Sequence, residues 1–106
     1  MSPIDSVEWV SPSIIRKIFN DGQYYHKALS GQLTIDLKQD RVLQNPPVGE
    51  PMGTRSQIVF YYDLEKNFVA VVHQYMRPDG TIGASGKPDP KKLFHQGRLY
   101  AVEKES

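Results

Sequence analysis

Apolar positions near the start of the chain recur at the spacing of an amphipathic helix. The apolar stripe is formed by Ile14, Ile15, Ile18 and Phe19. Ser11 followed by Pro12 is typical of a helix N-terminus, because the serine oxygen caps a backbone N–H and proline lacks one. Gly22 is a typical residue for ending a helix. The pattern therefore predicts a helix from Pro12 to Asp21.

Period-two alternation and β-branched or aromatic residues predict strands farther along the chain. Leu33, Ile35 and Leu37 alternate with polar residues, which predicts a half-buried strand. Residues 57–62 and 68–76 are separated by a short polar gap and predict a hairpin. In the second strand of this hairpin, the face expected in the core holds Phe68, Ala70, Val72 and Met76.

The remaining segments are defined mainly by proline and glycine. Two interpretations fit Gln23–Gly31, a second short helix or an irregular connection. Asn45–Arg55, with three prolines and two glycines, is predicted to be a loop. Thr81–Ala84 follows a turn and is expected to return as a short strand. Asp89 and Pro90 predict a helical turn through Phe94, and Leu99–Val102 reads as a last strand.

Size and composition bound the fold class. The chain has 106 residues, of which 39% are hydrophobic and 24% charged, as in one domain with a single core. With the pattern above, this predicts one α+β domain over residues 1–106. Its expected architecture is one N-terminal helix packed on a mostly antiparallel sheet of three to five strands.

Several classes of function are excluded by what the chain lacks. It has no cysteine, so disulfides and thiolate chemistry are excluded. No apolar run approaches the roughly 18 residues that a membrane span requires, and the formal net charge is only +1. We therefore expect a cytoplasmic protein that binds no membrane, and the sequence indicates no cofactor.

Positive charge is concentrated near the end of the chain. Segment 77–98 holds the basic residues Arg77, Lys87, Lys91, Lys92 and Arg98 against the acidic residues Asp79 and Asp89. A local excess of basic residues attracts anionic ligands even when the whole protein is nearly neutral. This segment is therefore predicted to bind RNA or an acidic protein partner.

The strand that precedes this basic segment carries residues capable of chemistry. His73, Tyr75 and Arg77 would share one face, and histidine can transfer a proton near neutral pH. Arginine can hold a phosphate with two hydrogen bonds. The candidate catalytic residues are His73, Arg77 and His95, where the second histidine would assist proton transfer. The candidate binding residues are Tyr75, Lys87, Lys91, Lys92 and Arg98.

Other interpretations of the same residues remain open. Alternating polar residues are also typical of the solvent face of an antiparallel strand. The glycines before Lys87 have the wrong spacing for a phosphate-binding loop, and the three histidines lack the spacing of a metal site. The aromatic residues expected in the core and rim, in preference to a surface on which nucleic-acid bases stack, are Trp9, Tyr24, Tyr25, Phe60, Tyr61 and Tyr62.

Three functions are compatible with these residues, and whether the protein is an enzyme is left open. The first is a binding module for RNA or an acidic partner. The second is a small metal-independent ribonuclease that uses the His73 face. The third is a protein-interaction or assembly subunit.

Overall fold

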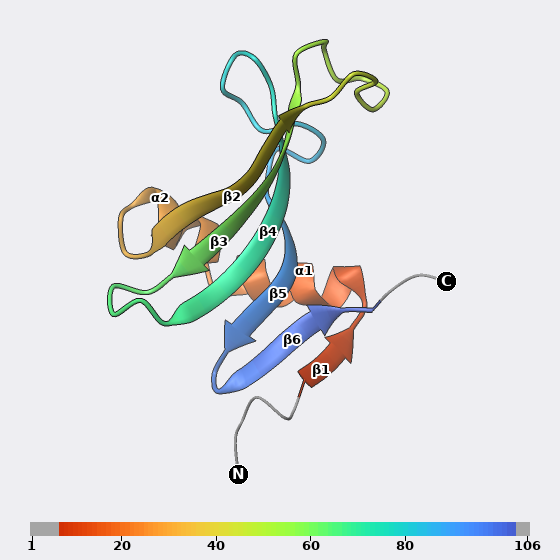
Figure 1. Cartoon of the computed structure of the whole chain (residues 1–106). Helices are drawn as coiled ribbons and strands as arrows, with labels where there is room; N and C mark the ends of the chain where they lie inside the picture. The colour runs from red at the N-terminus through yellow and green to blue at the C-terminus, as the bar shows by residue number, and fades with distance from the viewer. Residues whose placement is uncertain (1–6, 104–106) are drawn as a thin grey trace.

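The computed structural model describes residues 7–103, which fold into one six-stranded sheet and two helices (Figure 1). The α+β class predicted from the sequence is confirmed. In chain order the elements are β1 (Val7–Val10), α1 (Pro12–Asp21), α2 (Tyr24–Leu29), β2 (Thr34–Val42), β3 (Arg55–Tyr62), β4 (Phe68–Met76), β5 (Asp89–His95) and β6 (Arg98–Val102).

The sheet is mixed and larger than predicted. Its strand order is β1-β6-β5-β4-β3-β2, and all neighbours are antiparallel except β1 and β6, which run parallel. The prediction of three to five strands was therefore wrong. One strand that it missed is β1, whose Val7 pairs with Leu99 at the other end of the chain. Strand β1 has only four residues, and its partner strand lies at the other end of the chain. The local sequence therefore shows no alternation long enough to predict a strand.

Strand β5 occupies the segment that was predicted to form a helical turn. The Asp89-Pro90 pair indicated a helix start, yet Pro90 lies fully buried inside the strand, opposite Val72. Proline is tolerated here because β6 pairs with β5 only from Lys92 onward, so one side of Pro90 requires no ladder hydrogen bond. The short strand expected at Thr81–Ala84 is reduced to an isolated bridge between Ile82 and Met76.

Helix α1 has the predicted bounds, Pro12–Asp21. The backbone N–H of Ile14 donates to the Ser11 side-chain oxygen at 3.4 Å, as expected for the cap. The apolar stripe is narrower than predicted, because Ile14 is 49% exposed whereas Ile15 and Phe19 are fully buried. Within residues 7–103, no helix has the length and apolar character needed to cross a membrane.

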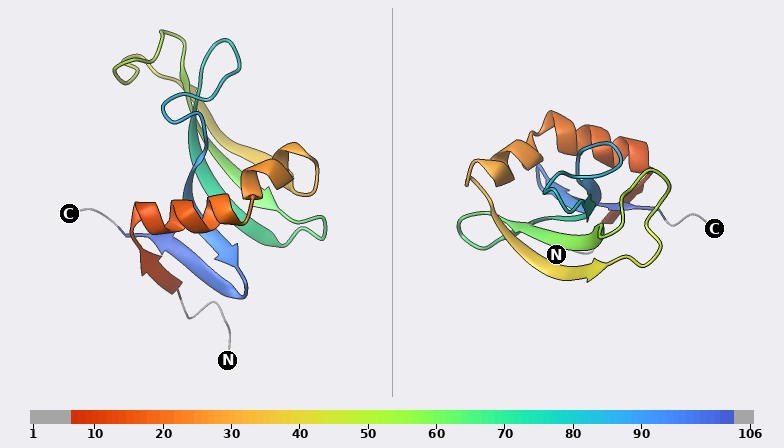
Figure 2. Two further views of the ribbon diagram at one scale, coloured as in Figure 1. Left: turned by 180° about the vertical axis from the view of Figure 1, so that it is seen from behind. Right: turned by 90° about the horizontal axis from the view of Figure 1, so that it is seen from above.

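Both helices lie on the same face of the sheet (Figure 2). Segment 24–29 forms the short helix α2, which settles the two interpretations of Gln23–Gly31. The core lies between the helices and the sheet. Its buried members are Ile15, Phe19, Leu33, Val59, Tyr61, Val69, Ala70, Val72 and Leu93.

Strand β2 exists as predicted but is not half-buried. Ile35 is 61% exposed and Leu37 is 48% exposed, and no residue of the strand is buried. The reason is its place at the edge of the sheet, since α1 packs over β5 and β6 at the other side. An edge position cannot be deduced from alternation alone, because alternation reports only that two faces differ.

A bulge in β4 changes the face of one predicted core residue. Ala70 and Val72 are fully buried beneath the helices, as predicted. Phe68 pairs with Tyr62, whereas Ala70 pairs with Tyr61, so Val69 is an extra residue between them. A single extra residue reverses the side of all positions before it. Phe68 therefore lies on the face opposite the helices.

Truncating the buried part of the α1 stripe should destabilise the fold strongly. We expect Ile15→Ala to lower the free energy of unfolding by about 2–5 kcal/mol, through lost burial and the cavity left behind. The matched variant Ile14→Ala, on the exposed side of the same helix, should cost less than about 1 kcal/mol. Urea denaturation measures both, and equal losses would contradict the packing described.

Candidate functional site

The sheet face opposite the helices is uncovered within the described residues. The strand register places one residue of each strand in a row across this face. From one edge to the other, this central row contains Trp9, Ala101, Lys92, Val71, Phe60 and Asp36. The row therefore holds four apolar side chains, of which Ala101 is buried, with Lys92 in its middle and Asp36 at its β2 end.

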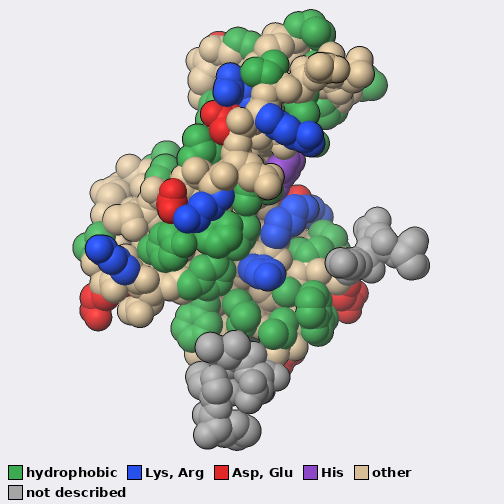
Figure 3. All heavy atoms as spheres, in the orientation of Figure 1, with side chains coloured by type: hydrophobic (Ala, Val, Ile, Leu, Met, Phe, Trp, Pro, Cys, Tyr) green, Lys and Arg blue, Asp and Glu red, His purple; other side chains and the backbone are tan. Residues whose placement is uncertain are grey.

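Further aromatic side chains flank the central row. The Phe60 ring centre lies 6.3 Å from that of Tyr62 and 6.2 Å from that of Phe68. Trp9 is 59% exposed and Phe94 is 42% exposed. We call this surface the open face, defined by Trp9, Phe60, Tyr62, Phe68, Phe94, Lys38 and Lys92. Figure 3 shows hydrophobic side chains gathered over this face with basic groups among them.

The two lysines of the open face have different neighbours. Lys38 Nζ lies 5.6 Å from the centre of the Phe60 ring and 2.8 Å from a carboxylate oxygen of Asp36. The hydrogen bond to Asp36, and then its charge, raise the pKa of Lys38. Lys92 makes no ion pair with another described residue. Its charge is therefore available to an anionic ligand in the middle of the row.

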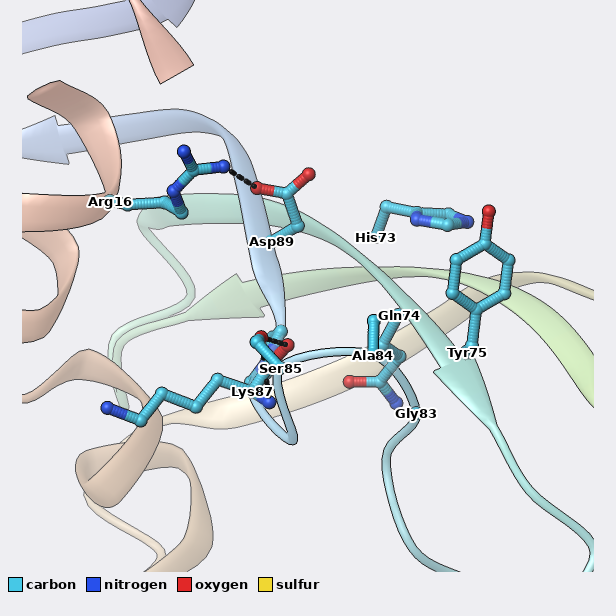
Figure 4. Close-up of a pocket in the computed structure, with 10 residues that line it drawn as sticks. Arg16, His73, Gln74, Tyr75, Gly83, Ala84, Ser85, Lys87 and Asp89 are labelled. Atoms are coloured by element: carbon cyan, nitrogen blue, oxygen red, sulfur yellow. Dashed lines mark hydrogen bonds and ion pairs between the residues drawn. The ribbon is translucent and has the colours of Figure 1, made fainter. Parts of the chain in front are cut away.

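A cavity of about 280 Å³ adjoins the open face where β4 meets the loop that leads into β5 (Figure 4). His73 and Tyr75 line it from β4, and Lys87 lines it from the loop. These three residues were predicted as site residues, and the fold brings them together. Arg16 of α1 and Asp89 complete the polar part of the lining.

His73 is held by neighbours on its own face. Its Nε2 lies 2.9 Å from the Ser56 hydroxyl, and its ring packs edge-on against Tyr75 with centres 4.8 Å apart. Burial lowers the pKa of His73, the charge of Lys91 lowers it further, and Asp89 opposes both. The imidazole is therefore neutral at pH 7 and acts there as a hydrogen-bonding group.

Asp89 forms ion pairs with two basic groups near the cavity. Its Oδ2 lies 2.9 Å from Lys91 Nζ, and its Oδ1 lies 3.8 Å from an Arg16 nitrogen. Such partly exposed pairs contribute little to stability. Their consequence here is electrostatic, because Asp89 offsets part of the positive charge of Lys91 and Arg16.

Arg77 lies outside the cavity and joins two loops. Its Nε donates to Glu50 Oε1 at 2.8 Å and its Nη2 to Glu50 Oε2 at 3.3 Å. The backbone N–H of Ala84 donates to the same carboxylate at 3.0 Å. These bonds, first that of Arg77 and then that of Ala84, lower the pKa of Glu50. Arg77 thus anchors the loop before β3 to the loop after β4.

The other two candidates, His95 and Arg98, lie far from His73. Asp89 pairs with His73 at the start of β5, and His95 ends that strand, about 17 Å along it once the bulge at Lys91 is counted. His95 Nδ1 lies 2.6 Å from the Tyr24 hydroxyl of α2. Arg98 donates to Glu8 at 3.0 Å at the β1 end of the sheet. The predicted catalytic residues therefore do not share one site.

The aromatic part of the open face was missed by the sequence analysis, which expected those residues in the core and rim. The available signal was the alternation of Phe60 and Tyr62 with the buried Tyr61. No group of His, Asp or Glu side chains that could hold a metal ion occurs within residues 7–103. Comparison of the chain with protein-family models, curated proteins and solved structures found no match.

Releasing the loop anchor should expose both loops to proteases. We expect Glu50→Gln to speed cleavage within residues 43–54 and 77–88, because the carboxylate that accepts from Arg77 and Ala84 is lost. Limited proteolysis with mass spectrometry identifies the cuts. Glu65→Gln, at the exposed turn between β3 and β4, is the matched control. Unchanged cleavage in the Glu50 variant would contradict this role.

Protonation of His73 should weaken the fold below neutral pH. Its native pKa lies below the ordinary value of 6.5, so the unfolded chain binds the proton more readily. The stabilisation is complete above about pH 6.5 and is lost as pH falls through the native pKa. We expect His73→Gln to reduce the pH dependence of the unfolding free energy between about pH 7 and pH 5.

The control for this measurement is His26→Gln, since His26 is exposed on α2. Denaturation curves at each pH give the slopes for wild type and both variants. If the His73 variant keeps the full wild-type slope of unfolding free energy against pH, another group causes that pH dependence.

Proposed function

We propose that this protein is a binding module that takes single-stranded RNA on the open face of its sheet. The observation that carries the proposal is the uncovered central row, in which Lys92 stands between exposed Trp9 and the ring of Phe60. Single-stranded nucleic acids are bound by aromatic rings on which bases stack and by basic groups that contact phosphates. Both kinds of group are present here on one face.

The dimensions of the row suit this mode of binding. Trp9 and Phe60 are four strand spacings apart, about 19 Å, and Lys92 lies about 10 Å from each. A chain lying across the strands could stack a base near either end and place a phosphate at the lysine. Stacking tolerates any base, so the proposed binding has little sequence preference.

The cavity beside the open face would extend the same interface. Lys87 is exposed there and makes no ion pair with another described residue, so it can contact a phosphate. Tyr75 offers a ring, and neutral His73 offers a hydrogen bond without charge repulsion or attraction. In the proposed contact, Lys87 would attract a phosphate, whereas Tyr75 and His73 would contact the RNA through uncharged groups.

Binding without cleavage is the form of the proposal that the geometry favours. Metal-independent RNA cleavage needs one group to remove a proton and another to supply one at the same phosphodiester. His73 on β4 and His95 at the end of β5 are about 17 Å apart along the strands, so one phosphodiester would not contact both. An acidic protein partner would use the lysines but has no need of the aromatic rings.

Two substitutions on the open face should weaken RNA binding in different ways. We expect Lys92→Glu to lower affinity and to reduce the slope of log affinity against log salt by about 1, because one phosphate contact is lost. Trp9→Ala should cost about 1–3 kcal/mol of binding free energy with the salt slope unchanged, because stacking is lost. Fluorescence anisotropy with labelled single-stranded RNA measures both.

The matched controls lie away from this face. Lys17→Glu makes the same charge change on α1, and Leu64→Ala removes an exposed apolar side chain at the β3–β4 turn. Both should bind as wild type does. Wild-type protein that fails to bind RNA at low salt would refute the proposal, and binding of an acidic protein instead would favour the interaction-subunit function. Cleavage of RNA in the presence of chelator would identify a ribonuclease.

A further inference from the structure

Strand β2 leaves one side of its backbone unpaired. It spans Thr34–Val42 at the edge of the sheet and pairs only with β3 among the described residues. All nine of its residues are exposed. A long exposed edge presents N–H and C=O groups that a further strand can bind.

A bulge at Lys38 determines which β2 side chains share a face. Ile35 pairs with buried Tyr61, so it lies on the helix side of the sheet. The register shifts between Leu37 and Gln39, so Val42, seven residues after Ile35, also lies on that side. In a regular strand an odd separation would place these two on opposite faces.

The open-face residues of β2 are related in the same way. Asp36 pairs with Phe60 before the bulge, and Arg41 pairs with Ser56 after it. The strand therefore carries an apolar residue near each end on the helix side. On the open face it carries an acidic residue near one end and a basic residue near the other.

We propose that two copies of this chain associate by antiparallel pairing of β2 with β2. In the inferred register, Ile35 of one copy lies opposite Val42 of the other, and Asp36 lies opposite Arg41. A two-fold axis repeats each pair, which gives two apolar pairs and two ion pairs, and between them Leu37 of each copy lies opposite Asp40 of the other. Cross-strand pairs of these kinds stabilise a sheet, and both members of each pair lie on the same face.

Neighbouring registers are less favourable. A shift of one residue places helix-side residues opposite open-face residues. A shift of two residues in one direction places Ile35 opposite Asp40 and Asp36 opposite Gln39, so both the apolar pair and the ion pair are lost. A shift in the other direction places Lys38 opposite Arg41, which is a like-charge pair. In the inferred register the two-fold axis passes between Lys38 and Gln39. The bulges of the two copies therefore lie next to each other.

Pairing would also cover apolar surface that the monomer leaves in water. Ile35 is 61% exposed, Leu37 is 48% exposed and Val42 is 53% exposed. A cavity of about 260 Å³ adjoins Ile35 on the helix side and is lined further by Leu29 and Val59. The strip of apolar side chains would thus continue from one copy into the next. This inference is independent of RNA binding.

A charge exchange tests both the interface and its register. We expect wild type to be dimeric in sedimentation analysis, and Asp36→Arg or Arg41→Asp alone to weaken the dimer at least about tenfold, since like charges then face each other twice. A mixture of the two single variants should form a heterodimer, because both facing pairs are then opposite in charge. Glu65→Arg, at the β3–β4 turn, should leave the dimer unchanged.

The exchange cannot act within one copy. Asp36 and Arg41 lie opposite Phe60 and Ser56, four residues apart on β3 and thus about 14 Å, so restored association in the mixture must arise between copies. Circular dichroism of each variant establishes that it is folded. Folded single variants that dimerise like wild type, or a mixture that stays monomeric, would overturn the proposed pairing.

Hydrogen exchange of the wild-type protein provides a test without substitution. Backbone amides of β2 should gain protection as protein concentration rises, whereas those of β1 at the other edge should not. A protein that remains monomeric up to about 1 mM would refute the inference. The inference would also be refuted if the amides of β1 or of the central strands gained protection with concentration while those of β2 did not.

Discussion

The packing of α1 against one face of the sheet determines which surfaces of this protein remain exposed. Ile15 and Phe19 are fully buried there together with Leu93 and Val72 of the central strands. Because α2 follows on the same side, both helices cover one face (Figure 2). The opposite face keeps its aromatic side chains in contact with solvent. Burial of one helix stripe thus also creates the surface that we propose to bind RNA.

Of the three register shifts in the sheet, those in β4 and β2 refine this arrangement. The extra residue Val69 in β4 moves Phe68 out of the predicted core and into contact with Phe60 on the open face. The bulge at Lys38 in β2 brings Val42 to the same side as residues near the start of that strand. Because side chains alternate, one inserted residue reassigns a whole half-strand. Both proposed surfaces depend on such a shift.

Electrostatics in this protein are local. The basic residues of segment 77–98 looked like one positive surface, but Arg77, Lys91 and Arg98 each meet a carboxylate in a different part of the fold. Lys92 makes no ion pair with another described residue and lies in the central row between Ala101 and Val71. An anionic ligand would therefore find a lysine within a stacking surface instead of a broad positive patch, and single substitutions can distinguish the two.

The sequence by itself determined the elements whose signals are local: helix Pro12–Asp21 with its cap, the hairpin of β3 and β4, and the common face of His73 and Tyr75. It did not determine β1, the strand character of β5, or which sheet face the helices cover. It also could not show that His73 and His95 lie far apart in the fold. Local periodicity reports backbone preference and one-sided burial within a segment. Strand partners, edges and bulges depend on contacts between segments far apart in the chain, and only the tertiary structure decides those.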